Sequence, residues 1–239
     1  MNKIKKTTVK DIDGNSYKTV KIGNQIWMAE NLKVTHLQNG LSIPHKKGWD
    51  YWKTQDNYSL TPYRYMENYG AFCNYDNDEK NVDIYGRLYN WFAAIDLDLP
   101  PEGWRIPSFN DWNKLWLNLT GQNLEEESIQ IEHQNNLGSK LAGNSKLWGC
   151  NCSKGFCLKC SYAFGNSGFD ALPGGARIGG FESKGKGAYF WTTTKDDCNV
   201  LPKEVARLKA YYIGINNQIK VLKKTQIKWY GFSIRCIKN

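Results

Sequence analysis

The chain has 239 residues, of which 14% are aromatic, and a formal net charge of +9 at pH 7. This composition excludes a disordered or fibrous chain, and no apolar run is long enough to cross a bilayer. The lysines are scattered and no arginine stripe is present, so the charge favours a solvated basic surface over specific nucleic-acid binding.

The first thirty residues predict three short strands, TTVKDI, YKTVKI and QIWMAENL. Asp13-Gly14 and Gly23-Asn24 separate them, and both dipeptides are typical of hairpin turns between alternating apolar residues. Residues 38–84 are polar and aromatic and have no clear period. This stretch is therefore predicted to form long ordered loops held by aromatic side chains.

Two helices are predicted in the middle of the chain. Residues 85–95, YGRLYNWFAAI, have apolar residues at helical spacing, namely Leu88, Trp91, Phe92 and Ile95. The second helix begins at Ser108 as N-cap, with Asp111 completing a capping box, and ends at Gly121. Its buried face is predicted to consist of Trp112, Leu115, Trp116 and Leu119.

After residue 165 the chain contains only strand signals, GFDALPGGARI, AYFWTTT, ARLKAYYIGI, QIKVLKK and FSIRCIK. Strands, then helices, then strands without β–α–β alternation indicate an α+β domain with an antiparallel sheet. Residues 122–165 interrupt this pattern with an acidic stretch, a short helical segment around LGSKLAGN and a cysteine cluster. Among the tryptophans, we expect Trp104, Trp112 and Trp191 to be buried, because they lie on apolar faces.

Seven phrases occur in one order, DIDGNSYKTVKIGNQIWMAENL, YDND, YGRLYNWFAA, PPEGWRIPSFNDWNKL, SGFDALPGGAR, AYFWTTT and GFSIRCIKN. Together they resemble the Fibrobacter succinogenes major paralogous domain family. The resemblance implies a C-type lectin-like fold, also similar to formylglycine-generating enzymes, with antiparallel sheets, two main helices and long ordered loops. It implies a single domain over residues 1–239. The cysteine-containing segment 122–165 is not part of the family pattern and is interpreted as an insertion.

The resemblance implies function only by analogy. Members occur mostly on surface or secreted proteins, and in variable proteins of similar fold the C-terminal strands and loops bind ligands. We therefore expect a non-catalytic binding or adhesion module, on a cell surface or a phage particle, that recognises a glycan or protein ligand. The alternative is a structural decoration protein within a larger homo- or hetero-oligomeric assembly, and a cryptic polysaccharide-acting enzyme comes third. The opening MNKIKK has no apolar segment after it, so synthesis without Sec export is also consistent.

The candidate ligand-binding residues lie in the C-terminal strands and turns. Asn216-Asn217 and the KWY triplet are in or beside turns and are expected to be exposed, where aromatic and polar groups suit a sugar or protein partner. Tyr211 and Tyr212 are adjacent in a strand, so one of them should be core. The candidates are Tyr212, Asn216, Asn217, Lys228, Trp229 and Tyr230.

No catalytic motif is found. The three histidines, His36, His45 and His133, lie in polar segments without a nucleophile motif, and GGARIGG lacks the spacing of a phosphate-binding loop. Cys198 and Cys236 do not match the copper-binding pair of formylglycine-generating enzymes. The chain is therefore not expected to be an enzyme.

Two stretches are candidate metal sites. CNCSKGFCLKC contains Cys150, Cys152, Cys157 and Cys160, which fit a structural zinc site, crossing disulfides or free thiols. With no export signal in view, zinc is favoured. NYDNDEKNVD has the oxygen ligands that calcium prefers but lacks the glycine and distal glutamate of an EF-hand loop. Calcium is the less favoured interpretation, because these carboxylates equally suit helix capping or bracing of a loop.

Overall fold

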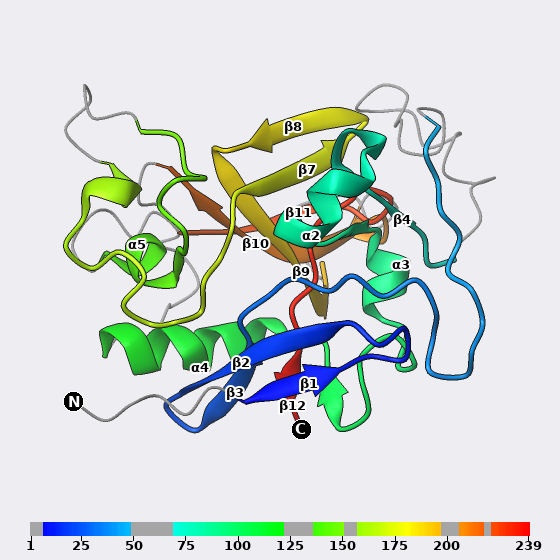
Figure 1. The fold of residues 1–239 in the computed structure, drawn as a ribbon, viewed down its shortest axis with the longest axis horizontal. Coiled ribbons are helices and arrows are strands. Elements are labelled where there is room, and N and C mark those ends of the chain that lie inside the picture. Colours follow the sequence, from blue (N-terminus) through cyan, green and yellow to red (C-terminus); the bar gives the residue numbers. More distant parts are fainter. Residues whose placement is uncertain (1–6, 49–68, 122–135, 151–156, 197–205, 218–220) are drawn as a thin grey trace.

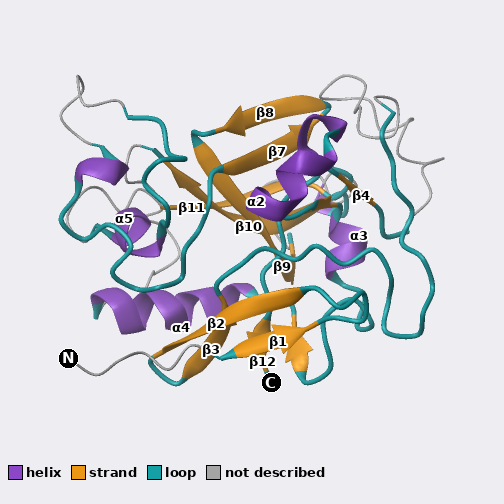
Figure 2. Cartoon of the chain, in the orientation of Figure 1, coloured by secondary structure: helices purple, strands orange, loops and turns teal. Residues whose placement is uncertain are grey.

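The computed structural model describes residues 7–48, 69–121, 136–150, 157–196, 206–217 and 221–239. Two five-stranded sheets and a two-stranded one account for most of the regular structure. The described helices are short except for α4, Phe109–Thr120, which runs beside the first sheet (Figures 1 and 2). The domain is therefore α+β with a predominance of strand. No helix in the described ranges is long and apolar enough to cross a membrane.

The first sheet joins the beginning and the end of the chain. Its strand order is β1-β2-β3-β12-β6. The pairing of Ile237 with Trp27 brings the last strand against the N-terminal meander. Gly14 and Gly23 have φ values of 82° and 58°, as their turns require, so the three predicted strands are confirmed. The strands are β1 (Thr8–Lys10), β2 (Ser16–Ile22), β3 (Gln25–Met28), β6 (Trp104–Arg105) and β12 (Ile237–Lys238).

The second sheet has the order β11-β10-β9-β7-β8 and is built from the C-terminal third of the chain (Figure 1). The pairings are antiparallel except for β7 with β9. β8 was not predicted; it forms because the chain turns back at Gly179, whose φ is 68°. The strands are β7 (Gly174–Ile178), β8 (Gly180–Lys184), β9 (Gly187–Lys195), β10 (Lys209–Asn216) and β11 (Val221–Ile227).

The capping box of α4 is present as predicted. The Ser108 hydroxyl accepts a hydrogen bond from the backbone N–H of Asp111, and the Asp111 carboxylate accepts one from the backbone N–H of Ser108 at 2.8 Å. Arg105 adds a two-pronged ion pair to the same carboxylate, with 2.6 and 2.8 Å contacts. These contacts hold the pKa of Asp111 below its usual value, although burial opposes them. Gly121 ends the helix in a left-handed conformation.

The helix predicted over residues 85–95 is wrong in its first half. Gly86, with φ of 74°, ends the short helix α2 (Val82–Tyr85), and the next residues form β5 (Leu88–Tyr89) against β4 (Phe72–Cys73). Tyr89 also exchanges two backbone hydrogen bonds with Phe232. Tertiary pairing therefore overrides the helical spacing. After Gly86 only α3 (Trp91–Ala94) is helical; the Asn90 side chain caps it, and Ile95 is exposed.

The long polar stretch before Gly86 contains more regular structure than was predicted. In addition to β4 and α2, it forms two short 3-10 helices, η2 (Tyr75–Asn77) and η3 (Glu79–Asn81). Much of the remainder of this stretch, residues 49–68, lies outside the described residues. The prediction of loops is therefore correct only for parts of the described stretch.

Two clusters of buried side chains fill the space around the sheets. One contains Trp112 and Phe190 and lies under α4, and the other contains Trp191 and Phe232 and lies under α3. Trp112 and Trp191 are fully buried, as expected. Trp104 is only partly buried, so its prediction is wrong: it lies on the two-residue edge strand β6, which has no further strand to cover it.

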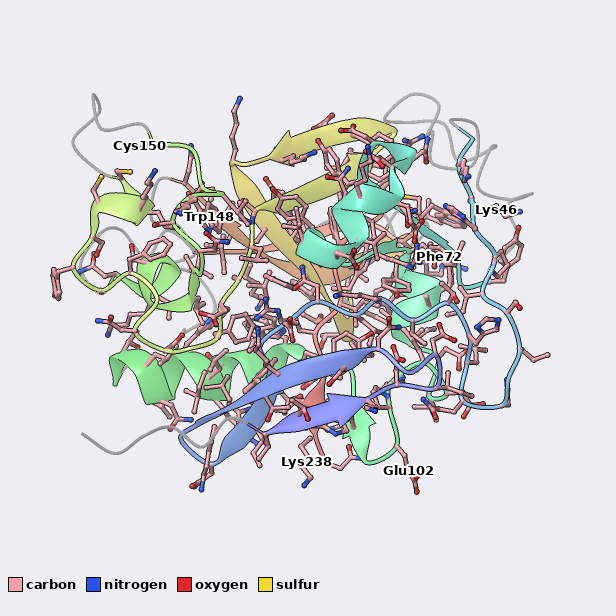
Figure 3. All side chains as sticks on the ribbon, viewed as in Figure 1. Lys46, Phe72, Glu102, Trp148, Cys150 and Lys238 are labelled. Atoms are coloured by element: carbon pink, nitrogen blue, oxygen red, sulfur yellow. The ribbon has the colours of Figure 1, made fainter. Side chains whose placement is uncertain are left out.

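The described part of the segment after residue 135 packs into the first of these clusters. It contains α5 (Leu137–Leu141) and the 3-10 turn η5 (Leu158–Cys160). Leu141, Trp148 and Leu158 are buried in the same cluster as Trp112. Figure 3 labels Trp148 and Cys150 near one another, on the opposite side of the molecule from Lys46. This segment therefore contributes to the core as well as carrying the cysteines.

Candidate functional site: the C-terminal strands and the thiol cluster

The KWY triplet is buried, so the expectation that it is exposed is wrong. Lys228, Trp229 and Tyr230 are 8%, 2% and 8% exposed. The Trp229 ring packs edge-on against Phe92 with centroids 5.0 Å apart, and the Lys228 ammonium lies 4.7 Å from the centroid of Trp91. Burial lowers the pKa of Lys228. These three residues cannot present their side chains to a large ligand in this conformation.

The reason lies in the path of the chain between β11 and β12. Gly231 exchanges backbone hydrogen bonds with Arg177, and Ser233 donates to the Tyr189 carbonyl, both in the second sheet. Ile234 accepts from Leu32. The segment is thus covered on both sides, and a turn signal in the sequence does not reveal such cover.

Arg235 is the charged residue at the centre of this segment, and it is fully buried. Its guanidinium donates to the Asn31 side chain at 2.8 Å, to the Asp170 carbonyl at 2.7 Å and to the Phe169 carbonyl. The Phe169 ring lies 4.4 Å from the guanidinium carbon. Burial lowers the pKa of Arg235 to about 9, so the group remains protonated at neutral pH. Arg235 therefore connects the segment that precedes β12 to the loop that precedes β7, and its role is structural.

Of the two adjacent tyrosines, Tyr212 is the core residue. It is 8% exposed and packs against Phe232 and Trp191, with centroids 4.8 and 6.4 Å away. Burial raises its pKa to about 12. Tyr211 points to the other face and stays half-buried. Tyr212 is therefore unsuited to the ligand contact for which it was a candidate, and Tyr211 is the accessible ring of the pair.

An aromatic and cationic stack that the sequence did not single out surrounds Tyr211. The Lys223 ammonium lies 3.9 Å from the centroid of Phe109 and 4.9 Å from that of Tyr211. All three side chains are partly exposed, and Lys223 belongs to β11, the edge strand of its sheet. Phe109 is the first residue of α4 and lies outside the predicted buried face of that helix. A large aromatic residue outside the buried face is the sequence signal that could have identified this stack.

Asn216 and Asn217 lie at the far end of β10 and are partly exposed. The Asn217 N–H donates to the Lys186 carbonyl at 2.9 Å, and its carbonyl accepts from Leu158 at 3.2 Å. Both contacts use backbone atoms. The end of β10 is thus fastened to the turn before β9 and to the cysteine segment.

The cysteine segment brings three sulfur atoms together. Cys150 Sγ lies 3.4 Å from Cys157 Sγ and 3.8 Å from Cys160 Sγ, and all three lie within 4.8 Å of one another. Cys157 is buried, while Cys150 and Cys160 are exposed. Within the described residues, this is the group of three or more potential metal-binding side chains. Cys152 lies outside the described residues.

The oxidation states of these sulfurs differ. Cys150 is disulfide-bonded, whereas Cys157 and Cys160 carry thiols. The hydrogen bond with Cys157 raises the pKa of Cys160. Elsewhere, burial raises the pKa of the free thiol of Cys73 to about 12. A buried thiol of that kind is inert, so the chemistry of sulfur in the described chain is concentrated in the cluster.

The acidic stretch before α2 braces a loop. Asp78 accepts a hydrogen bond from the Lys80 N–H and caps η3, Glu79 pairs with Arg87 at 2.8 Å, and Asp76 lies 3.7 Å from Lys184. These three carboxylates thus have protein partners, in agreement with the capping and bracing interpretation. A calcium site there stays a prediction.

The histidines in the described chain do not form a triad. His36 contacts both the Asp13 carboxylate, at 2.6 Å, and the Thr35 hydroxyl, at 3.2 Å, through the same nitrogen, Nδ1. A triad needs one ring nitrogen for the nucleophile and the other for the carboxylate. His45 stacks on Phe72 with centroids 4.7 Å apart, and burial lowers its pKa. His133 lies outside the described residues.

A hollow of about 560 Å³ borders the second core cluster, between the end of α3 and β6. Its apolar part comes from Ile95, Leu97 and Trp104, and Leu97 is 92% exposed. The cation in its lining, Arg105, is already committed to Asp111. The hollow thus combines apolar surface with the polar residues Asp96, Thr193 and Asn239.

The arrangement defines an α+β domain in which the C-terminal strands form one sheet and the last strand closes the other. A family model described as Fibrobacter succinogenes major domain matches residues 20–238. The chain therefore belongs to the Fibrobacter succinogenes major domain family, which confirms the resemblance found in the sequence. No curated protein and no solved structure matches the chain.

Proposed function

We propose that this protein is a non-catalytic binding or adhesion module with a C-type lectin-like fold, displayed on a cell surface or a phage particle. It recognises a glycan or protein ligand through the β10–β11 edge. The pairing of β12 with β3, which joins the two ends of the chain, supports this fold assignment. The proposed ligand surface consists of Phe109, Tyr211 and Lys223 at one end and Asn216-Asn217 at the other.

The observation that carries the proposal is the half-exposed stack of Lys223 on two aromatic rings. Ring faces bind sugars and apolar protein side chains, and a neighbouring ammonium supplies a donor that fixes orientation. Asn217, six residues after Tyr211, follows the alternation that places every second side chain on the Tyr211 face, and the separation corresponds to about 20 Å. A ligand that contacts both ends is therefore several sugar rings or an extended peptide in length.

The test uses two adjacent charge reversals. Lys223 and Lys224 are neighbours in β11 and point to opposite faces, because side chains alternate along a strand. Lys223→Glu should weaken binding to an immobilised glycan array, or to immobilised host or bacterial surface proteins, by about tenfold or more, as loss of a central contact does. Lys224→Glu makes the same change in net charge and should leave binding near that of the wild type.

Equal losses in the two variants would mean that net charge, and not this surface, controls binding. Absence of binding together with a stable high-order assembly in light scattering would favour the decoration role instead. Tyr211→Ala provides a second check, since it removes one ring of the stack and retains Lys223.

A further inference from the structure

The sulfur atoms of the cluster are spaced like ligands of one metal ion. With Zn–S bonds of about 2.3 Å, a tetrahedral site has sulfur atoms about 3.8 Å apart. The two measured Sγ–Sγ distances from Cys150 are 3.4 and 3.8 Å. Three sulfur atoms within 4.8 Å of one another can therefore share one tetrahedral ion once Cys150 is reduced.

The backbone holds the ligands in position before any metal binds. Cys157 is the N-cap and Cys160 the last residue of the 3-10 turn η5, which is closed by a hydrogen bond from the Cys160 N–H to the Cys157 carbonyl at 3.1 Å. Leu158 within this turn is fully buried, and its carbonyl accepts from the Ser139 hydroxyl at 3.0 Å. On the other side, the Gly149 N–H donates to the Gly185 carbonyl at 2.7 Å and positions Cys150.

We propose that Cys150, Cys157 and Cys160 of the reduced chain bind one zinc ion, which fastens the cysteine segment to the ends of β8 and β10. Thiolate ligands and tetrahedral geometry are what zinc prefers. The site does not depend on the binding role proposed above.

Zinc binding and the disulfide of Cys150 exclude each other. A dithiol reductant supplies two electrons and two protons to convert the disulfide into two thiols, and is itself oxidised to a disulfide. Cys150, Cys157 and Cys160 then each release one proton as their sulfurs bind zinc. A disulfide oxidant, which is itself reduced to two thiols, re-forms the Cys150 disulfide; Cys157 and Cys160 take up protons from water and the ion leaves. Bound zinc therefore reports the redox state of this segment.

The ion also affects the proposed ligand surface. The Leu158 N–H donates to the Asn217 carbonyl, and the Asn217 N–H donates to the Lys186 carbonyl. A metal that fixes η5 therefore restricts the end of β10 through one backbone hydrogen bond. Loss of the ion should increase amide hydrogen exchange at Leu158 and Asn217 without unfolding the sheets.

The experiment uses the full chain, purified and kept in a dithiol reductant that does not remove protein-bound zinc. Elemental analysis should find about one zinc per chain, and cobalt substitution should give the intense sulfur-to-cobalt absorption of a thiolate site. Cys157→Ser and Cys160→Ser should each lower zinc occupancy to less than about a tenth at the same free zinc concentration. Cys73→Ala, at a buried thiol that belongs to a different cluster, is the matched control and should keep full occupancy.

Because a cysteine variant can fail to fold, the wild-type chain is also treated with a chelator. It should lose zinc, gain reactive thiols and keep its near-ultraviolet circular dichroism. Two results would overturn the proposal: reduced wild-type protein whose cluster thiols react at once and which takes up no zinc, or zinc that remains bound in both serine variants.

Discussion

The segment 228–236 and the end of β10 with the cysteine turn are both polar and aromatic in sequence, yet they differ in structure. In the first, Lys228 and Arg235 are buried and direct their side chains at backbone carbonyls, ring faces and, for Arg235, the Asn31 side chain. In the second, the hydrogen bonds that hold the end of β10 in place join backbone atoms, and the side chains of Asn217 and Cys160 remain accessible. The comparison teaches that availability for a ligand follows from which atoms make the structural contacts, and not from residue type.

The largest expected effect is at the centre of the buried segment. Arg235→Lys keeps the charge but replaces a planar fork by a point donor, which leaves buried acceptors unpaired. We expect a loss of about 3–5 kcal/mol in the free energy of unfolding, measured by denaturant titration. Arg105→Lys, at a partly exposed ion pair, should cost less than about 1 kcal/mol. If the two variants are equally stable, Arg235 does not hold the segment in place.

Trp229 and Tyr211 test the difference between a buried and an accessible ring. Trp229→Ala should lower the free energy of unfolding by about 3–5 kcal/mol, because it leaves a large cavity beside Phe92. Tyr211→Ala removes a half-buried ring and should cost less than about 1.5 kcal/mol. Thermal unfolding of both proteins measures this directly. A wild-type melting temperature for Trp229→Ala would return that residue to the ligand surface.

Lys228 makes the buried segment sensitive to alkaline pH. Burial lowers the pKa of Lys228 in the folded state, so between that pKa and the unfolded value the unfolded chain binds more protons. Stability should therefore rise as pH increases through this window, and Lys228→Met should lack that rise. Denaturant titrations of both proteins at neutral and alkaline pH give the difference. A constant difference across pH would show that Lys228 titrates alike in both states.

The smallest effect is expected at the end of β10. Asn217→Ala retains both backbone hydrogen bonds and should change the free energy of unfolding by no more than about 0.5 kcal/mol. Asn217→Pro removes the N–H that donates to Lys186 and should cost at least about 1 kcal/mol. Calorimetry of the two variants separates the main chain from the side chain. A large loss in Asn217→Ala would mean that the side chain is structural.

The sequence by itself determined the N-terminal meander, α4 with its capping box, four of the five strands of the second sheet, and the family. These features depend on contacts within a few residues, such as the Ser108–Asp111 pair and the glycine turns, so local patterns are sufficient. The cysteine spacing likewise identified the candidate metal-binding side chains. It did not show which of them converge.

Only the tertiary structure decided the exposure of the C-terminal aromatics and the fate of residues 85–95. Leu88 and Tyr89 became a strand because Cys73 pairs with Leu88, and Phe72 and Phe232 pair with Tyr89; none of these partners is a sequence neighbour. Trp229 became core for the same reason, since Phe92 covers it. The Lys223 stack joins the start of α4 to an edge strand more than a hundred residues later. Burial is a property of all neighbours at once, and a local pattern of apolar and polar residues contains only the near ones.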